Sequence, residues 1–369
     1  MRVLHLVSSP TLTGAAEPAL DMVLGLRALG VQADLRIDRV REGNLAGVLA
    51  QAQVEAPADL ALSTKAGPAQ IVGDLLRLPQ LLAGYDVVHT HMSHDHALAA
   101  VARASAPSVR LVRSVHAARV LAPGLARGWV LRDADGLTVA CRDHRDRLRR
   151  DHGVPATRIL RLPGSVSPAR FFPDPAARAR VRTAEGWAGR FCVGCVARFQ
   201  AGRRHEVLMD AAALARRQVP ELTLVLIGHG ETEAALRQRA AAPDLAGAVV
   251  FTGYKRADLN DYLSALDAAA WLVPGNDATS RSVLQAMAAG LPVIGGDEGA
   301  IREAVRPGRT GLLAAPDDPG AVAAAMVALA LDPGRAEGMG LRGLARARRL
   351  YHPSLRARRL LAFYRRILS

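Results

Sequence analysis

Cysteine, lysine and aromatic residues are all scarce in this chain. Its three cysteines form a single C-x-x-C pair, one pair too few for a four-ligand zinc site, and Cys192 and Cys195 alternate to opposite faces of a strand-like run. Aromatic residues make up 4% of the sequence, which is little for a surface that stacks nucleic-acid bases. These shortages argue against a thiol redox centre, a zinc cluster and a base-stacking platform.

Long hydrophobic runs are missing as well. No stretch of about eighteen uninterrupted apolar residues occurs. The N-terminus passes directly into the short strand-like run Val3 to Val7, without a charged region followed by a long apolar one. We therefore expect a cytoplasmic protein without a signal peptide or a membrane-spanning helix.

Positive charge is in excess, and arginine supplies nearly all of it. The formal net charge is +14, and Lys65 and Lys255 are the only lysines. Residues 142–150 and 342–366 mix arginine with apolar residues as amphipathic helices do. These segments either rest on an anionic membrane surface, at the inner face of the membrane, or are solvated helix faces. Nucleic acid is not an expected partner, because aromatic residues do not interleave with the arginines.

Strand-like and helix-like segments alternate along the chain. The strand candidates are residues 3–7, 33–37, 86–89, 110–115, 136–140, 191–197, 222–227, 248–251, 269–273 and 293–294. Helix-like segments such as residues 16–29, 204–217 and 231–241 lie between them. This alternation predicts an α/β fold with parallel sheets. A chain of 369 residues, half of them hydrophobic, is long enough for two such domains.

The segment from Pro274 to Ile294 carries the most specific pattern. Thr279, Ser280 and Ser282 can cap a helix whose apolar residues recur at helical spacing, and Gly290 ends that helix before a buried strand. A helix start in a parallel sheet presents unpaired N–H groups near the strand ends, where phosphorylated ligands bind. An ordinary helix-to-strand unit would give the same pattern.

The same segment resembles the signature of retaining GT-B glycosyltransferases of family 4. That signature has two glutamates eight positions apart, with Ala-Met-Ala after the second and then Gly-x-Pro-Val. The matching residues here are Ala286, Met287, Ala288, Gly290, Pro292 and Val293. The two acidic positions fall on Asp277 and Gln285, so both glutamates are replaced.

The resemblance covers nearly the full length and implies the GT-B architecture, with two Rossmann-like doubly wound parallel-sheet domains and a cleft between them. It implies an N-terminal acceptor domain at residues 1–173 and a donor domain at residues 174–350, and the prolines within residues 171–178 fit a boundary there. A last helix, within residues 351–369, is expected to cross back onto the first domain.

The resemblance also implies a binding site for a nucleoside diphosphate sugar. Arg198 and Arg203 stand where relatives hold an arginine and a lysine on the diphosphate, and both follow a strand-like run. Arg204 replaces the glycine that normally comes next. Other expected donor-binding residues are Gly14, Ala15, Gly228, Gly230, Tyr254, Lys255, Thr279, Ser280, Arg281, Ser282 and Gln285.

Histidines gather in the N-terminal half. His116 ends a strand-like run and resembles the family's catalytic-cleft histidine, so it joins Asp277, Arg198 and Arg203 as a catalytic candidate. His89, His91, His94, Asp95 and His96 form a polar group with ligand-like spacing. We expect this group to line a cleft rim and not to bind a metal.

These features together predict a sugar transfer with retention of configuration, from a nucleoside diphosphate sugar to a saccharide or lipid-linked acceptor. No other cofactor and no metal are expected. Two alternatives stay open: a GT-B protein that binds a nucleotide-sugar or a partner without transfer, because both signature glutamates are changed, and an arginine-rich nucleic-acid binder.

Overall fold

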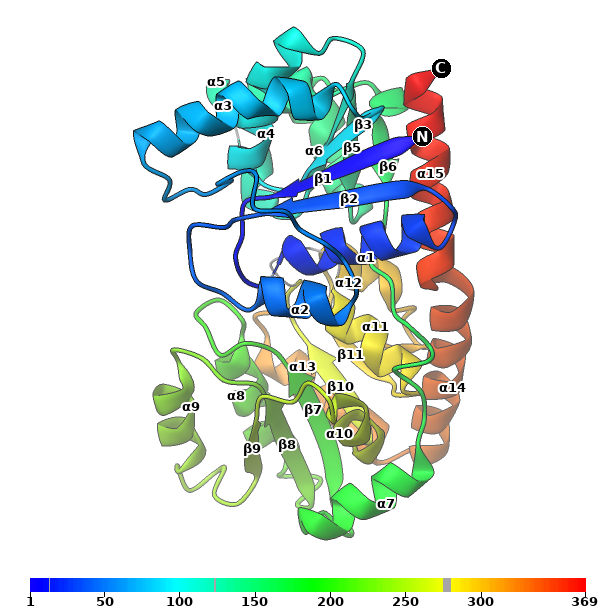
Figure 1. The fold of residues 1–369 in the computed structure, drawn as a ribbon. Helices are drawn as coiled ribbons and strands as arrows, with labels where there is room; N and C mark the ends of the chain where they lie inside the picture. Colours follow the sequence, from blue (N-terminus) through cyan, green and yellow to red (C-terminus); the bar gives the residue numbers. More distant parts are fainter. Residues whose placement is uncertain (13, 123, 275–279) are drawn as a thin grey trace. The chain divides into compact units, whose positions relative to one another are not determined.

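The structure, a computed structural model, describes residues 1–12, 14–122, 124–274 and 280–369, except for the side chains of residues 125–127 and 129. The described chain forms two compact units (Figure 1). Unit 1 contains Met1–Gly164 and Pro353–Ser369, and unit 2 contains Ser165–Pro274 and Ser280–His352. The chain therefore leaves unit 1 and returns to it at its C-terminus.

Unit 1 is built on a parallel sheet with the strand order β2-β1-β3-β4-β5-β6. The strands are β1 Arg2–Val7, β2 Gln32–Ile37, β3 Val87–Thr90, β4 Arg110–Val115, β5 Gly136–Val139 and β6 Ile159–Arg161. The helices are α1 Ala16–Arg27, α2 Leu45–Gln51, α3 Pro68–Leu82, α4 Ser93–Ala102, α5 Leu125–Asp133, α6 Arg142–His152 and α15 Pro353–Leu368. The winding direction reverses between β1 and β3, which makes this the switch point of the sheet.

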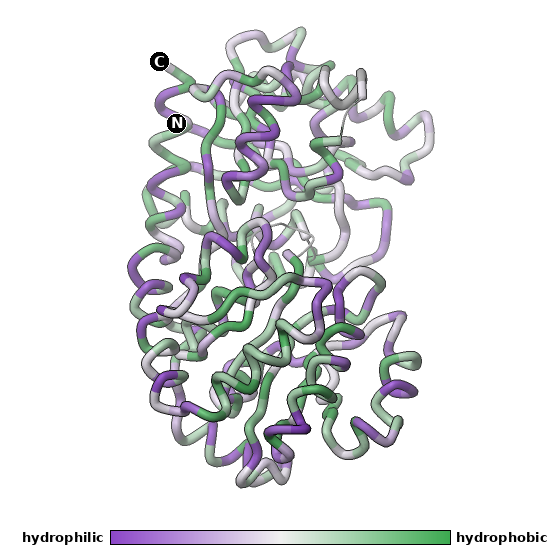
Figure 2. The backbone as a smooth tube through the Cα atoms, turned by 180° about the vertical axis from the view of Figure 1, so that it is seen from behind, coloured by the Kyte–Doolittle hydropathy of each residue, from purple (hydrophilic) through white to green (hydrophobic). Residues whose placement is uncertain are grey.

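Helices cover both faces of this sheet, because successive strand residues point to opposite sides. Val3 of β1 packs in one layer with α1, α2 and α15, and Leu4 packs in the other with α3 and α4. The tube of α15 alternates between hydrophobic and hydrophilic residues (Figure 2), and its Leu360 and Phe363 lie in the first layer. The apolar side of this basic helix is therefore buried inside unit 1. This arrangement is the one expected if its arginines form a solvated helix face.

Unit 2 repeats the design with the strand order β12-β11-β10-β7-β8-β9, again parallel throughout. Its strands are β7 Phe191–Val196, β8 Leu222–Ile227, β9 Val249–Gly253, β10 Ala268–Trp271, β11 Val293–Gly296 and β12 Gly311–Ala314. Its helices are α7 Pro175–Ala184, α8 His205–Ala215, α9 Glu233–Ala240, α10 Leu259–Ala265, α11 Arg281–Ala288, α12 Gly299–Ala304, α13 Pro319–Ala330 and α14 Pro333–Leu350. The switch point lies between β7 and β10.

The sheets confirm the predicted α/β fold, with two strands that the sequence did not predict. β6 and β12 are short and stand at the edges of their sheets. An edge strand needs less apolar alternation than a central one, so its pattern is weak. None of the helices in the described ranges combines the length and the hydrophobicity that a membrane crossing requires.

Candidate active site

The switch point of unit 2 brings together the loops after β7 and β10. Arg198 follows β7 directly and is exposed, whereas Arg203, further along the same loop, is half-buried. The guanidinium of Arg203 donates from Nη1 to the carbonyl oxygen of Pro274, which follows β10, at 3.2 Å. Two arginines thus stand at the carboxyl end of the sheet, where doubly wound folds bind charged ligands.

Glycine is required in the neighbouring loop after β8. A Cβ at Gly228 would lie 2.1 Å from the carbonyl oxygen of Ala197, and one at Gly230 would lie 2.1 Å from that of Phe199. The backbone N–H of Phe199 also donates to the carbonyl oxygen of His229 at 3.0 Å. The two glycines therefore let this loop pack directly against the loop that carries Arg198.

Arg204 occupies its position in a conformation typical of glycine. Its φ is 62°, in the left-handed region, and its guanidinium pairs with the carboxylate of Asp317, with Nη2 and Oδ2 3.0 Å apart. Arg204 therefore holds a left-handed turn that glycine would adopt without strain. An arginine pays about 1–2 kcal/mol for this conformation, and the ion pair offsets part of it.

The loop after β9 offers an aromatic surface. Tyr254 is 65% exposed, and its ring meets the ring of His229 edge-on at 5.5 Å between centroids. The ammonium of Lys255 lies 3.4 Å from a carboxylate oxygen of Asp258 and 4.2 Å from the ring centroid of Tyr262. The ammonium of Lys255 is therefore paired with the acidic residue that precedes α10.

The start of α11 differs from the prediction. Ser280 occupies the position before the helix, but with φ 51° and without a side-chain hydrogen bond to the helix, so it does not cap α11 as expected. Its hydroxyl is buried and has no partner among the described residues. Arg281, Ser282 and Gln285 are half-buried on α11. The predicted residues Asp277 and Thr279 lie outside the described residues.

In unit 1 the turn after β1 leads into α1. Gly14 has φ 43°, and a Cβ placed on it would meet nothing within 4 Å. Ala15 has φ −75° and ψ −29°, which alanine adopts without strain. The alanine that stands for a second glycine is therefore accommodated at no conformational cost.

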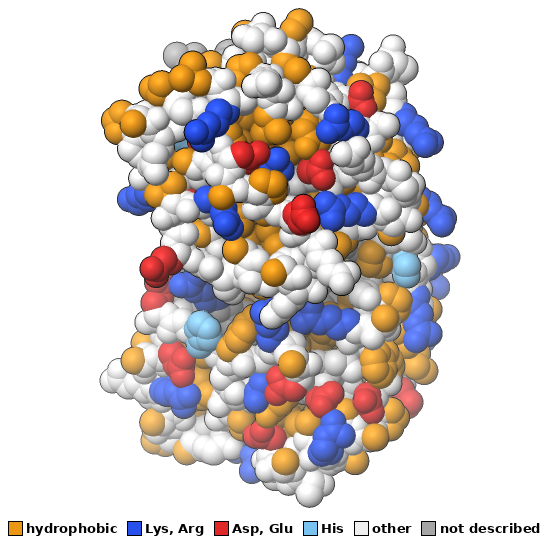
Figure 3. All heavy atoms as spheres, viewed as in Figure 1, with side chains coloured by type: hydrophobic (Ala, Val, Ile, Leu, Met, Phe, Trp, Pro, Cys, Tyr) orange, Lys and Arg blue, Asp and Glu red, His pale blue; other side chains and the backbone are white. Residues whose placement is uncertain are grey.

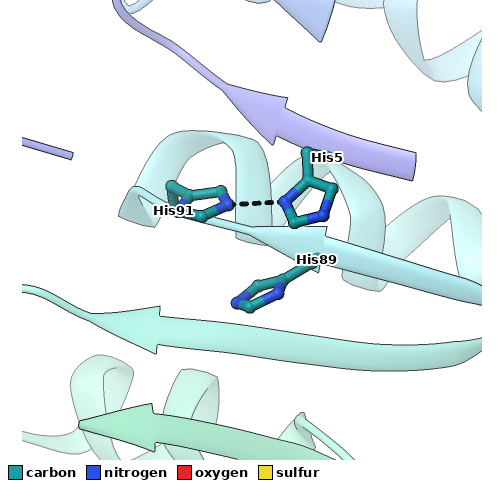
Figure 4. Close-up of side chains that lie close together, drawn as sticks. All are labelled: His5, His89 and His91. Carbon is teal, nitrogen blue, oxygen red and sulfur yellow. Dashed lines mark hydrogen bonds between the residues drawn. The ribbon is translucent and has the colours of Figure 1, made fainter. Parts of the chain in front are cut away.

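His116 follows β4 and is linked to two further histidines. Its Nε2 lies 3.1 Å from Nδ1 of His91, and Nε2 of His91 lies 3.0 Å from Nδ1 of His5. His5 is on β1 and His91 follows β3, so the row crosses the switch point of the sheet (Figure 4). Neighbouring rings are stacked, with centroids 5.3 and 5.4 Å apart.

A second row of polar side chains crosses the same face of the sheet. Nδ1 of His89 is 2.5 Å from the hydroxyl of Tyr364 on α15, and Nε2 is 2.9 Å from Oγ of Ser114. Ser114 in turn is 2.8 Å from the hydroxyl of Thr138. Every group in this row is buried.

Burial keeps the imidazoles of His5, His89 and His91 neutral at physiological pH. It lowers the pKa of His5 to about 3 and places the pKa values of His89 and His91 well below the ordinary value. Conversely, burial raises the pKa of the phenol of Tyr364, which therefore stays protonated and able to donate.

The predicted cleft rim is wrong for His89, His91, Asp95 and His96, which are interior, whereas His94 is half-buried. His89 and His91 are 0% and 3% exposed. Asp95 is buried too, and its carboxylate accepts the backbone N–H groups of His91, Met92 and His96 at the start of α4. The carboxylate of Asp95 therefore pairs with N–H groups at the N-terminus of α4, and this role explains its spacing from the histidines.

Three histidines in this region could together hold a metal ion. One nitrogen from each of His5, His89 and His91 lies within 4.8 Å of the others. Both nitrogens of His89, however, are already hydrogen-bonded to Ser114 and Tyr364. A metal would have to displace one of these bonds, so the geometry fits a hydrogen-bonded network better.

Sequence reasoning missed three residues, His5 and Tyr364 in unit 1 and Glu298 in unit 2. His5 and Tyr364 join the histidine rows, and the available signal was a polar residue at an inward-facing position of an apolar strand or helix. Glu298 follows β11, and its partial burial raises the pKa of its carboxyl group. The sequence signal for Glu298 was a carboxylate after a strand end, but its neighbour Asp297 carries the same signal.

Two doubly wound parallel sheets of these strand orders make this chain a protein of the GT-B glycosyltransferase fold. The solved structure of Anabaena Alr3699/HepE in complex with UDP matches with a TM-score of 0.83 at 20% identity, covering 98% of this chain and 99% of that one. Sucrose-phosphate synthase from Thermosynechococcus elongatus matches with a TM-score of 0.76 at 19% identity, covering 100% and 99%.

The sequence relatives define the family. Residues 13–170 match the family described as Glycosyltransferase Family 4, and residues 190–332 match that described as Glycosyl transferases group 1. The GDP-mannose-dependent alpha-(1-6)-phosphatidylinositol monomannoside mannosyltransferase of Mycolicibacterium smegmatis is 34% identical, over 57% of this chain and 57% of its own length. The protein of the same name from Mycobacterium tuberculosis H37Rv is 32% identical over 73% of both. The chain therefore belongs to the family 4, group 1 glycosyltransferases.

Proposed function

We propose that this glycosyltransferase moves a sugar from a nucleoside diphosphate sugar to a saccharide or lipid-linked acceptor, with retention of configuration and without a metal ion. The observation that carries the proposal is the pair Arg198 and Arg203 at the switch point of unit 2, beside a loop that needs glycine at two positions. A diphosphate leaving group gains negative charge as its bond to the sugar breaks, and fixed guanidinium groups stabilise that charge.

Unit 2 would bind the donor. The left-handed turn at Arg204 and the close approach of Gly230 to Phe199 fix the loops that frame the diphosphate. Tyr254 and Lys255 after β9 stand where the base would lie, and Gln285 on α11 can accept from one ribose hydroxyl and donate to another. The donor-contacting role of Asp277 rests on the sequence resemblance.

Unit 1 would bind the acceptor, with His116 close to the transferred sugar. Retention is proposed from the resemblance to retaining enzymes, and none of the residues assigned to the site is an evident nucleophile for a double displacement. We therefore favour departure and attack on one face of the sugar, with the leaving phosphate taking the acceptor's proton. The relatives are GDP-mannose-dependent and act on a phosphatidylinositol mannoside, so these are the first donor and acceptor to test.

A cytoplasmic location at the inner face of the membrane would suit a lipid-linked acceptor. The arginines of α6 and α15 would then meet anionic headgroups, since the buried residues of both helices already pack inside unit 1.

The test begins with thermal denaturation of the full chain against a panel of nucleoside diphosphate sugars, with duplex DNA as the control ligand. We expect one donor to raise the melting temperature selectively, and Arg203→Ala to abolish that rise. Arg217→Ala is the matched control, because Arg217 is an exposed arginine that follows α8 and precedes β8, at the opposite end of the strands. A response to DNA alone would support the nucleic-acid alternative.

The donor found in this way is then incubated with acceptors, with and without EDTA, and the product linkage is determined by NMR. An α-linked product from an α-linked donor, formed at the same rate in EDTA, is the expected result. Donor binding without transfer to any acceptor would support the non-catalytic alternative, and an inverted linkage would exclude the retaining mechanism.

A further inference from the structure

A cavity opens beside β2, the strand at one edge of the unit 1 sheet. Its volume is about 430 Å³, within the roughly 300–1,000 Å³ that ligand sites span. We call it the edge cavity, and its lining residues are Arg27, Asp34, Arg36, Gln53, Glu55, Pro57 and Tyr85. In Figure 3, acidic and basic side chains lie side by side on the surface over β2. The cavity is therefore polar and lined by charges of both signs.

The edge cavity lies away from the candidate transfer residues of unit 1. Arg27 ends α1 and Tyr85 precedes β3, so both stand near the amino ends of the strands. His116, by contrast, follows β4 and stands at the carboxyl end of the same sheet. Open parallel sheets bind the ligand of their switch point at the carboxyl ends of the strands. A ligand in the edge cavity would therefore occupy a second site.

Asp34 and Arg27 form a pair in this cavity that a ligand can reach. Oδ1 of Asp34 is 3.5 Å from Nη2 of Arg27, and Oδ2 accepts from the hydroxyl of Tyr85 at 2.8 Å. The side chains of Arg27 and Asp34 are 33% and 27% exposed. A carboxylate accepts several hydrogen bonds and a guanidinium donates several. The pair can therefore accept from one hydroxyl group of a ligand and donate to its neighbour.

Other contacts hold the arginines of the cavity in place. Arg36 donates from Nε and Nη2 to the two carboxylate oxygens of Asp59, at 2.6 and 2.8 Å. Nε of Arg27 donates to the carbonyl oxygen of Ala33 at 2.7 Å. Side chains that are ordered in advance lose less conformational entropy when a ligand binds. The geometry of the edge cavity is therefore set before any ligand enters.

The charges of the lining select the kind of ligand. Two arginines and two acidic residues, Asp34 and Glu55, line the edge cavity. An anion such as phosphate would meet the two carboxylates, and a cation would meet the two guanidinium groups. A lipid tail would cover these charged groups without giving them hydrogen bonds. A neutral ligand with many hydroxyl groups avoids these costs and can bond to both kinds of charged group, and this is the chemistry of a saccharide.

We infer that the edge cavity is a second saccharide-binding site of unit 1, separate from the site of transfer, in which Asp34 and Arg27 bind adjacent hydroxyl groups of one sugar ring. The inference goes beyond the proposed function and does not depend on it, because binding here needs neither a donor nor a transfer step.

Saturation-transfer difference NMR of the full chain tests this site directly. The probes are neutral disaccharides of glucose, galactose or mannose, and inorganic phosphate is added as a competitor. We expect at least one disaccharide to bind both the unmodified chain and the His116→Ala variant, and phosphate not to displace it. Asp34→Asn should raise its Kd by at least about 10-fold, because the change removes charge-assisted hydrogen bonds to the ligand.

Glu55→Gln and Glu42→Gln form a matched pair of variants. Both glutamates are exposed and lie between β2 and α3, but Glu55 lines the edge cavity and Glu42 does not. We expect Glu55→Gln to raise the Kd of the disaccharide about 3- to 10-fold and Glu42→Gln to leave it unchanged. Because both positions are exposed, this pair still decides the question if Asp34→Asn fails to fold.

Failure of every disaccharide to bind the unmodified chain would overturn the inference. Binding that His116→Ala abolishes and Asp34→Asn leaves intact would overturn it too, because the saccharide would then lie at the site of transfer alone. Displacement of the disaccharide by phosphate would show an anion site in its place. Failure of the proposed function would appear differently, as saccharide binding at the edge cavity in a chain that transfers no sugar.

Discussion

At the scale of single residues, Arg204 adopts a backbone conformation that is typical of glycine. The left-handed φ of 62° is disfavoured for arginine, and the ion pair with Asp317 draws the side chain across the loop. The sequence shows that arginine replaces glycine at position 204. It does not show the φ angle that the arginine adopts, because that angle depends on the folded structure. Only the structure shows that the turn beside Arg203 is left-handed.

Two variants separate the strain at Arg204 from its ion pair. Arg204→Ala loses the pair and keeps the strain, whereas Arg204→Gly loses the pair and relieves the strain. We expect Arg204→Gly to be more stable than Arg204→Ala by about 1 kcal/mol in urea unfolding. Equal stability of the two variants would mean that the left-handed turn costs nothing here.

Arg203 has a different role, because its charge is assigned to the diphosphate. Replacing it with alanine removes charge-assisted hydrogen bonds worth roughly 1.5–3 kcal/mol, or about 10- to 150-fold in turnover. Steady-state kinetics with the identified donor measure this loss. Arg217→Ala should retain full turnover, and an Arg203→Ala enzyme that does the same would refute the assigned site.

At the scale of secondary-structure elements, the sequence predicted central strands well and side-chain rows poorly. β1, β7 and β8 are long and largely apolar, so their pattern predicted their bounds within one or two residues. The row from His89 through Ser114 to Thr138 depends on the register between β3, β4 and β5, and no single strand carries that information. The phenol that completes it comes from α15, far along the chain.

Tyr364→Phe tests the contribution of α15 to this row. The change removes only the hydroxyl and leaves Nδ1 of His89 without its partner inside unit 1. An unsatisfied buried group costs about 1–3 kcal/mol, which should appear as a lower free energy of unfolding. Tyr254→Phe is the matched control, since Tyr254 is 65% exposed and its hydroxyl can bond to water. A smaller loss in Tyr364→Phe than in the control would contradict the assigned hydrogen bond.

At the scale of the whole molecule, the large net charge comes with many acidic residues, 34 Asp and Glu against 48 Lys and Arg. On the face shown in Figure 3, Asp and Glu side chains lie among the arginines. In unit 2, for example, Arg180 pairs with Asp261 and Arg239 pairs with Asp210. Much of the arginine is therefore engaged within the protein, which is consistent with a small-molecule enzyme and offers little support for the nucleic-acid alternative.

The buried histidines make the stability of unit 1 depend on pH. His5 and His96, both with pKa values of about 3, bind no proton in the folded state at pH 5 but bind one when unfolded. His89 and His91 act in the same direction. Asp95 opposes them, because burial raises its pKa to about 7 and the folded state therefore binds a proton before the unfolded state does.

Because four imidazoles outweigh one carboxyl group, the free energy of unfolding should fall as the pH drops from about 6.5 towards 3 and should change little above pH 7. Each uncompensated group contributes about 1.4 kcal/mol per pH unit. In unit 2, His205 with a pKa of about 4 gives a smaller effect. Hydrogen exchange at pH 7 and pH 5 should therefore show a larger loss of protection in β1 and β3 than in β7 and β8. Equal losses in the two sheets would contradict this account.

The return of α15 to unit 1 has a consequence for how the protein is made. Ribosomal synthesis delivers the N-terminus first, and domains generally fold in that order. Here Leu360, Phe363 and Tyr364 belong to the core of unit 1 and emerge after every strand of unit 2. All strands of unit 2 are synthesised before α15, so unit 1 is begun first and completed last. A stop codon just before α15 would therefore leave the core of unit 1 incomplete, while unit 2 would keep all of its strands.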